Sequence, residues 1–187
     1  MDDRLFKKWN RWIDTIHFEI RSLSVNRHIF WEVQKIIKKN PKIQKPSSFY
    51  EFLGCVYGAS ALMGIRRQIK ISSDSISFAR LLKEICDKPE ILSRKRFVDL
   101  YKGSVVERFA NKDFDEFAGK VGSYVDPDLV NLDLKKLKKK AKKCEKYADM
   151  RVAHYDERAI KNILKFKVFA ECIDYLEELI KKYILLF

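Results

Sequence analysis

One of the chain's three histidines stands in the sequence YADMRVAHYDER, residues 147–158, beside other groups that can take part in acid–base chemistry. Arg151 and His154 are three residues apart and would share a face of a continuing helix. An arginine can bind a phosphate through two N–H groups, and a histidine can transfer a proton at neutral pH. The pair therefore fits phosphodiester cleavage. The polar neighbours that could support such a site are Asp149, Tyr155 and Asp156.

The same residues also fit an ordinary junction between two helices. Asp156 could cap the N-terminus of the helix that follows. Arg151 and His154 would be favourable at the C-terminus of the helix that precedes, where the helix dipole attracts positive charge. The residue types alone leave both interpretations open. The other histidines, His17 and His28, stand inside the first predicted helix, and we expect them to be structural or to face solvent.

A run of basic residues precedes this stretch. Eight lysines stand between Lys135 and Lys146, and the chain has a formal net charge of +13. Such charge attracts polyanions through long-range attraction and counterion release, so we expect a nucleic acid, RNA or DNA, as a partner. The phosphate-binding candidates are Lys139, Lys140, Lys143, Lys146, Arg66 and Arg67. The alternative is that the lysines keep a helix soluble and the two arginines favour a helix C-terminus.

Several classes of function are disfavoured by the absence of their motifs. The sequence has no P-loop, no dinucleotide-binding glycine motif, no paired-histidine zinc motif and no serine-centred elbow. The four cysteines are far apart, which predicts buried thiols in a reducing compartment and neither structural zinc nor another cofactor. No apolar run approaches the roughly 18 residues that span a bilayer. We therefore expect a cytoplasmic protein with no membrane partner.

Apolar periodicity predicts that long helices position these groups. The predicted helices lie at about residues 3–38 (with a bend near 22–26), 48–70, within 71–88, twice within 91–122, from 127 onward and from about 157 to 187. The helix that begins at Pro127 has a narrow apolar seam of Val130, Leu134, Leu137, Ala141, Cys144 and Ala148. Small residues on one face of the second helix, Gly54, Gly58 and Ala61, predict close approach of another backbone. The expected fold is a single all-α domain over 1–187, an antiparallel bundle with a shorter-helix insertion at 91–122.

Several stretches resemble one family. The sequence ADMRVAHYD (148–156), placed before a final long helix, resembles the motif of the HEPN superfamily, and specifically of its abortive-infection U-type (AbiU-like) branch. The stretches MGIRRQIKISSDSISFARLLKEICDKPEILSRKRF (63–97), YVDPDLVNLDLKKL (124–137) and KKYILLF (181–187) resemble the same branch. The resemblance covers most of the chain.

The resemblance implies a HEPN-like helical bundle that commonly forms a homodimer. It implies a metal-independent endoribonuclease of phage-defence or toxin type, with an antitoxin or a defence-system protein as a further partner. The family signature is an arginine a few residues before a histidine. His154 matches the histidine, and Asp149 matches the polar residue that commonly follows the arginine. Counted back from His154, the arginine of this signature would stand at residue 147, 148 or 149. These residues are Tyr147, Ala148 and Asp149, and none of them is basic.

Three functional hypotheses therefore remain open. In the first, the chain is a ribonuclease in which Arg151 or Lys146 replaces the motif arginine and His154 is the acid or base. In the second, it is a HEPN protein that binds RNA, a nucleotide or a defence partner without cleavage. In the third, it is a structural or interaction bundle whose lysines only solvate a helix face.

Overall fold

The computed structural model describes residues 3–119, 122–153, 157 and 164–187. The chain is 81% helical, and the described residues contain no strand, although Ser93 and Tyr124 form an isolated antiparallel bridge. The α-helices are α1 (Asp3–Lys39), α2 (Ser48–Ile69), α3 (Phe78–Asp87), α4 (Arg94–Tyr101), α5 (Ala110–Ala118), α6 (Pro127–Tyr147) and α7 (Phe166–Ile184). A π-helical segment, η4 (Ala148–Ala153), follows α6 directly. The all-α prediction is confirmed.

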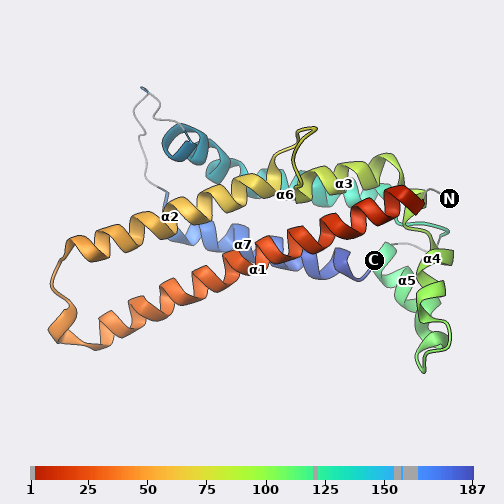
Figure 1. The fold of residues 1–187 in the computed structure, drawn as a ribbon, viewed down its shortest axis with the longest axis horizontal. Coiled ribbons are helices and arrows are strands. Elements are labelled where there is room, and N and C mark those ends of the chain that lie inside the picture. Colours follow the sequence, from red (N-terminus) through yellow and green to blue (C-terminus); the bar gives the residue numbers. More distant parts are fainter. Residues whose placement is uncertain (1–2, 120–121, 154–156, 158–163) are drawn as a thin grey trace.

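The long helices lie roughly along one axis (Figure 1). α1 and α2 form an antiparallel hairpin, and α3 continues in the direction of α2. α6 packs against α2, α3 and α7, whereas α7 also packs against α1. The two shorter helices expected within 91–122 are α4 and α5, which pack on each other beside the two chain ends (Figure 1). No helix among the described residues is long and apolar enough to cross a bilayer.

Polar side chains begin the helices where the sequence predicts them. The Ser77 hydroxyl accepts a hydrogen bond from the Arg80 backbone N–H at 3.1 Å and so caps α3. The Asp126 carboxylate caps α6, with Pro127 in the first turn. Ser47 occupies the N-cap position of α2, but its side chain makes no capping hydrogen bond.

The first helix is continuous at the place where the sequence suggests a bend. α1 continues without interruption through residues 22–26, where we expected a bend. The hydroxyls of Ser22 and Ser24 donate to the carbonyls of Phe18 and Ile20 at 2.9 and 3.1 Å, one turn earlier. These serines therefore satisfy their polar groups within the helix instead of interrupting it.

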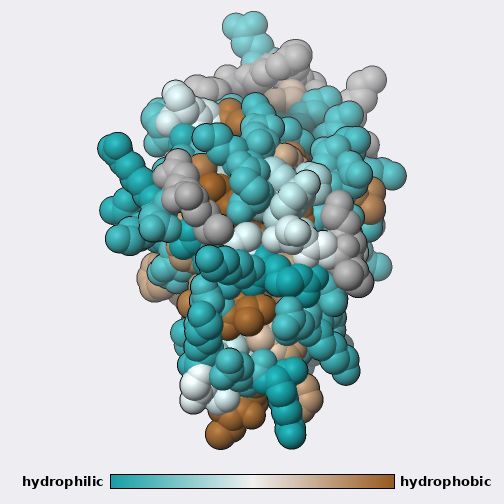
Figure 2. All heavy atoms as spheres, turned by 90° about the vertical axis from the view of Figure 1, so that its right-hand side faces the viewer, coloured by the Kyte–Doolittle hydropathy of each residue, from teal (hydrophilic) through white to brown (hydrophobic). Residues whose placement is uncertain are grey.

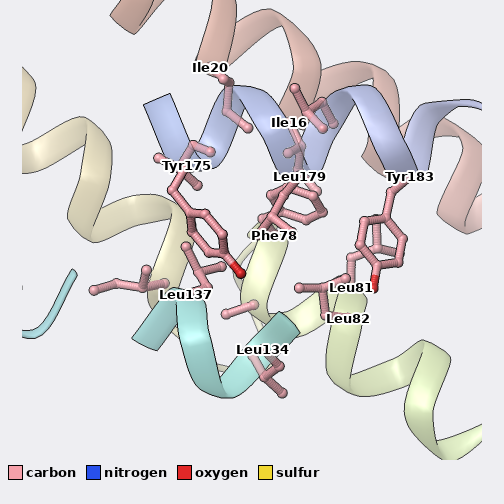
Figure 3. Packing of buried hydrophobic residues seen from close by; sticks show 14 of the residues in the cluster. Ile16, Ile20, Phe78, Leu81, Leu82, Leu134, Leu137, Tyr175, Leu179 and Tyr183 are labelled. Atoms are coloured by element: carbon pink, nitrogen blue, oxygen red, sulfur yellow. The ribbon is translucent and has the colours of Figure 1, made fainter. Parts of the chain in front are cut away.

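The core forms where α1, α3, α6 and α7 meet. Figure 3 shows Ile16 of α1, Phe78 of α3, Leu137 of α6 and Tyr183 of α7 converging on it. The Phe78 and Tyr183 rings meet edge to face, with their centroids 5.8 Å apart. All six seam residues of α6 are buried, as the periodicity predicts. Figure 2 views the end that carries the chain termini, where apolar atoms lie as separate spots among hydrophilic ones.

Several buried polar groups at this core are paired, whereas the buried Tyr175 hydroxyl has no hydrogen-bond partner among the described residues. Trp9 of α1 donates its indole N–H to the Glu84 carboxylate of α3 at 2.8 Å. The Tyr183 hydroxyl of α7 donates to the Asp133 carboxylate of α6 at 3.0 Å. Burial, together with the Asp133 charge, raises the pKa of Tyr183 far above its usual range, so this hydroxyl stays protonated and remains a donor.

The last helix begins later than predicted. α7 starts at Phe166, with Lys165 in an extended conformation at the N-cap position. Asp156, the cap that the sequence suggested, lies outside the described residues. The Phe166 ring lies within 5.7 Å, centroid to centroid, of the rings of Phe30, Tyr57 and Phe169. This aromatic cluster anchors the first turn of α7 against α1 and α2. Residues 158–163, which we expected to be helical, lie outside the described part of the chain.

The close helix–helix approach occurs later in α2 than the sequence indicates. A methyl group on Gly58 would meet only the rings of Phe166 and Phe169, at ordinary contact distances of 3.7 and 3.9 Å. A methyl group on Gly64 would instead overlap the Leu23 side chain of α1. The predicted approach at Gly54 and Gly58 is therefore wrong, because aromatic side chains, not another backbone, cover these glycines.

We expect Gly64→Ala to destabilise the protein by about 1–3 kcal/mol, because the added methyl group displaces Leu23 in a buried contact. The matched change Gly58→Ala should raise stability by up to about 1 kcal/mol, since alanine favours a helix and the space is open. Urea denaturation followed by circular dichroism measures both. Equal effects of the two changes would contradict the placement of the close contact.

Candidate functional site

The lysines predicted to bind phosphate lie on the solvent face of α6. The buried seam occupies one side of this helix, so the remaining positions must face water. The exposed candidates on α6 are Lys139, Lys140, Lys143 and Lys146. Lys139, Lys143 and Lys146 follow each other at helical spacing and form one row. Lys140 differs, because its ammonium lies 5.1 Å from the centroid of the Tyr175 ring of α7.

The row of lysines leads directly into η4. Ala148 is fully buried, which holds this π-helical segment against the bundle. The Arg66 guanidinium of α2 donates to the Asp149 carboxylate of η4 at 2.5 Å and forms an ion pair across the two elements. Single π-helical turns often occur at functional sites because the wider winding changes which side chains share a face. The ion pair with Arg66 therefore holds Asp149, and with it η4, against α2.

The two adjacent arginines of α2 do not form one anion site. Arg67 points to the other side of the helix and donates to the Glu19 carboxylate of α1 at 2.7 and 3.1 Å. Arg66 points to η4. Each guanidinium is neutralised by its own carboxylate, so the pair serves to tie α2 to two neighbours.

An open groove of about 1030 Å³ lies between α2, η4 and the start of α7. Small residues of α2 form part of its lining, among them Gly54, Gly58 and Ala59. The remaining lining residues are Tyr50, Glu51, Cys55, Leu62, Tyr147, Arg151, Val152, Leu164, Lys165, Phe166 and Phe169. The groove thus combines apolar and aromatic walls with two cationic side chains, Arg151 and Lys165, and one carboxylate, Glu51. This combination fits a ligand with both a flat apolar part and an anionic part.

Arg151, the predicted phosphate contact, is the candidate that the structure places in this groove. Its backbone belongs to η4, and its side chain is half-buried. His154, Tyr155 and Asp156 follow immediately in the chain but lie outside the described residues. Both remaining histidines, His17 and His28, are exposed on α1. In the described part of the chain, no group of three metal-ligating side chains gathers.

The sequence did not indicate two parts of this site. Gly54 and Gly58 were interpreted as a helix-packing face, whereas here they border the groove. Lys165 and Phe166 were placed inside a continuous helix, where nothing marked them as a helix start. The isolated Lys165 between two apolar residues is the only signal available, and such a pattern is common at any amphipathic helix.

No model of a protein family, no curated protein and no solved structure matches the chain.

Proposed function

We propose that the chain is a HEPN-like RNA-binding protein that cleaves its bound RNA without a metal ion. In this proposal the lysine row of α6 (Lys139, Lys143 and Lys146) binds the RNA backbone. Arg151 contacts the phosphate at the cleavage point, and His154 transfers the proton. The observation that carries the proposal is that the exposed lysine row ends at Lys146, directly before the π-helical segment whose Arg151 lines the groove.

The chemistry follows from the residue types. Cleavage of RNA at a 2′-hydroxyl removes a proton from that hydroxyl and places negative charge on the phosphorus-bound oxygens. A guanidinium stabilises that charge, and an imidazole can accept or return the proton. The aromatic groove wall suits unpaired bases, because any base can stack on an aromatic ring.

A second candidate function is RNA binding without cleavage. It is favoured by the residues at the three positions where the family carries its arginine. Among these, Ala148 is buried and Asp149 pairs with Arg66, so neither leaves a cation there. The two candidates share the same binding surface and differ only in whether Arg151 and His154 act on the phosphate. The antitoxin or defence-system partner implied by the resemblance is compatible with either candidate.

Changing the lysine row tests the binding surface. We expect Lys139→Glu/Lys143→Glu/Lys146→Glu to weaken binding of a single-stranded RNA at least about tenfold and to reduce the salt slope by about 2, because three phosphate contacts are lost. Fluorescence anisotropy at several salt concentrations measures both quantities. Lys140 is left unchanged because it packs on Tyr175.

The matched control reverses three exposed lysines on other helices, Lys7, Lys70 and Lys181. It has the same net charge as the test variant and should lose much less affinity. Equal losses would mean that net charge alone attracts RNA. Binding that does not change with salt would contradict the proposal as a whole.

Changing the two groups in the motif tests cleavage. We expect His154→Gln and Arg151→Gln each to lower the rate of RNA cleavage about 100-fold or more while RNA binding is largely retained. Gel analysis of a labelled RNA in the presence of a metal chelator measures the rate. Arg67→Gln is the control, because Arg67 contacts Glu19 on another face and should not affect cleavage. Tight binding without cleavage by the unchanged chain would favour the second candidate.

The homodimer is a further part of the proposal. Four large apolar residues on the outer side of α1, opposite its core face, are 47–69% exposed: Phe18, Val25, Ile29 and Ile36. Their steps of seven, four and seven residues match the seam of a coiled coil. α2 also carries exposed apolar residues: Phe49, Phe52 and Val56. Exposed apolar rows mark interaction sites, and we assign the row of α1 to a second copy of the chain.

Introducing a charge into this row tests the assignment. We expect Ile29→Lys to convert the dimer into a monomer, because the ammonium cannot be buried without a partner. Sedimentation-equilibrium centrifugation measures the mass. Leu132→Lys, which adds the same charge at an exposed apolar residue of α6 outside the row, should leave the dimer intact. A monomeric unchanged chain would overturn this part of the proposal.

A further inference from the structure

Two cysteines that are far apart in the sequence meet between α6 and α7. The Sγ atoms of Cys144 and Cys172 are 3.6 Å apart and share a hydrogen bond. Cys144 is fully buried, whereas Cys172 is 4% exposed. The sequence predicted isolated buried thiols. Both of these thiols are buried as predicted, but they are not isolated, because the seam of α6 faces α7 at this level.

The other two cysteines have different surroundings. Cys55 is exposed, and Cys86 is half-buried with its thiol 3.7 Å from the Pro127 carbonyl oxygen. Among the described residues, Cys144 and Cys172 are therefore the two cysteines whose thiols lie close together. The packing around the pair is tight, because the space lined by Ile65, Leu137, Ala141 and Cys172 has no room for a water molecule.

The geometry is suited to a disulfide bond. The two sulfurs of a disulfide are about 2.05 Å apart, so closure requires a shift of roughly 1.5 Å shared between two side chains. Rotation of the Cys172 side chain toward Cys144 would also break its contact with the Lys140 carbonyl oxygen, which lies at 3.3 Å. Both movements involve side chains and leave the two helices in place.

The two thiols differ in their readiness to react. The hydrogen bond from Cys144 and the charge of Lys140 lower the pKa of Cys172. The hydrogen bond with Cys172 and burial raise the pKa of Cys144. The lower pKa makes Cys172 the more readily ionised thiol and therefore the nucleophile of the pair.

We propose that Cys144 and Cys172 form a peroxide-reactive dithiol site that closes to a disulfide. The Cys172 sulfur attacks one oxygen of a hydroperoxide, the O–O bond breaks, and the Cys172 proton leaves with the other oxygen as an alcohol or water. The Cys144 sulfur then attacks the sulfenic acid sulfur, an S–S bond forms, and the displaced hydroxyl leaves as water with the Cys144 proton. Two thiols lose two electrons, and the hydroperoxide gains them.

The cross-link would act on the segment that borders the groove. Residues 145–171 form the loop that the disulfide closes, and this loop contains η4 and the first turn of α7. Closing it restricts the unfolded chain more than the folded one and therefore stabilises the fold. The proposed disulfide does not depend on RNA binding. Its test can therefore succeed or fail whatever the function of the chain is.

The test treats the reduced, folded protein with hydrogen peroxide and then removes the peroxide with catalase. The protein is unfolded in iodoacetamide, digested and analysed by mass spectrometry. We expect a peptide that links Cys144 to Cys172, an intact mass lower by two hydrogen atoms, and unmodified reactivity of Cys55. The thermal midpoint should rise by roughly 5–10 °C and return to its starting value with dithiothreitol.

Two variants identify the roles of the thiols. Cys144→Ala should leave the Cys172 sulfenic acid unresolved, so that dimedone labels it. Cys55→Ser/Cys86→Ser should form the same cross-link as the unchanged chain. Alkylation of both Cys144 and Cys172 after peroxide treatment of the folded chain would overturn the proposal, as would cross-links mainly to Cys55. The measurement on the unchanged chain decides this even where a variant fails to fold.

Discussion

Burial of the α6 seam is the constraint on which the other features of the molecule depend. Six apolar side chains from Val130 to Ala148 pack against α2, α3 and α7, and burying each of the larger ones contributes roughly 1.5–3 kcal/mol. The rotation of α6 about its axis is thereby determined. The lysines must then face water, Cys144 must face α7, and the final turn must meet α2.

The change from α-helical to π-helical winding at Ala148 decides how the chain leaves the bundle. Ala148 is still part of the seam, whereas Asp149 already pairs with Arg66 of α2. Arg151 lines the groove because the ion pair and the buried alanine hold the same short segment from two sides. An ion pair of this half-exposed kind contributes modestly to stability, so its main effect is to select one orientation.

Charge is distributed unevenly over the long helices. The outer face of α6 carries lysines with few acidic residues among them. Both arginines of α2 are paired, Arg66 with Asp149 and Arg67 with Glu19, and Arg27 of α1 is paired with Asp174. A polyanion would therefore meet little uncompensated charge on α2 and a row of lysines along α6. The apolar outer row of α1 lies on a different face, so RNA binding and dimer formation would not compete for one surface.

Local patterns of residues are sufficient to predict most of the helices. Periodicity identifies α1, α2, α6 and the body of α7, and Asp126 with Pro127 marks the start of α6. These signals come from residues that are close together in the chain, so the sequence contains them directly. The lysine row is predicted for the same reason, because the seam and the lysines alternate within one helix.

Contacts between distant segments could not be predicted in this way. The pairing of Arg66 with Asp149, of Cys144 with Cys172 and of Gly64 with Leu23 depends on how each helix is rotated and shifted against another. The late start of α7 depends on Phe166 packing against Phe30 and Tyr57, which come from two other helices. The sequence by itself determined the helices and their apolar and basic faces, because both arise within a few turns. The tertiary structure alone decided which faces meet, because burial is shared among helices that are distant in the chain.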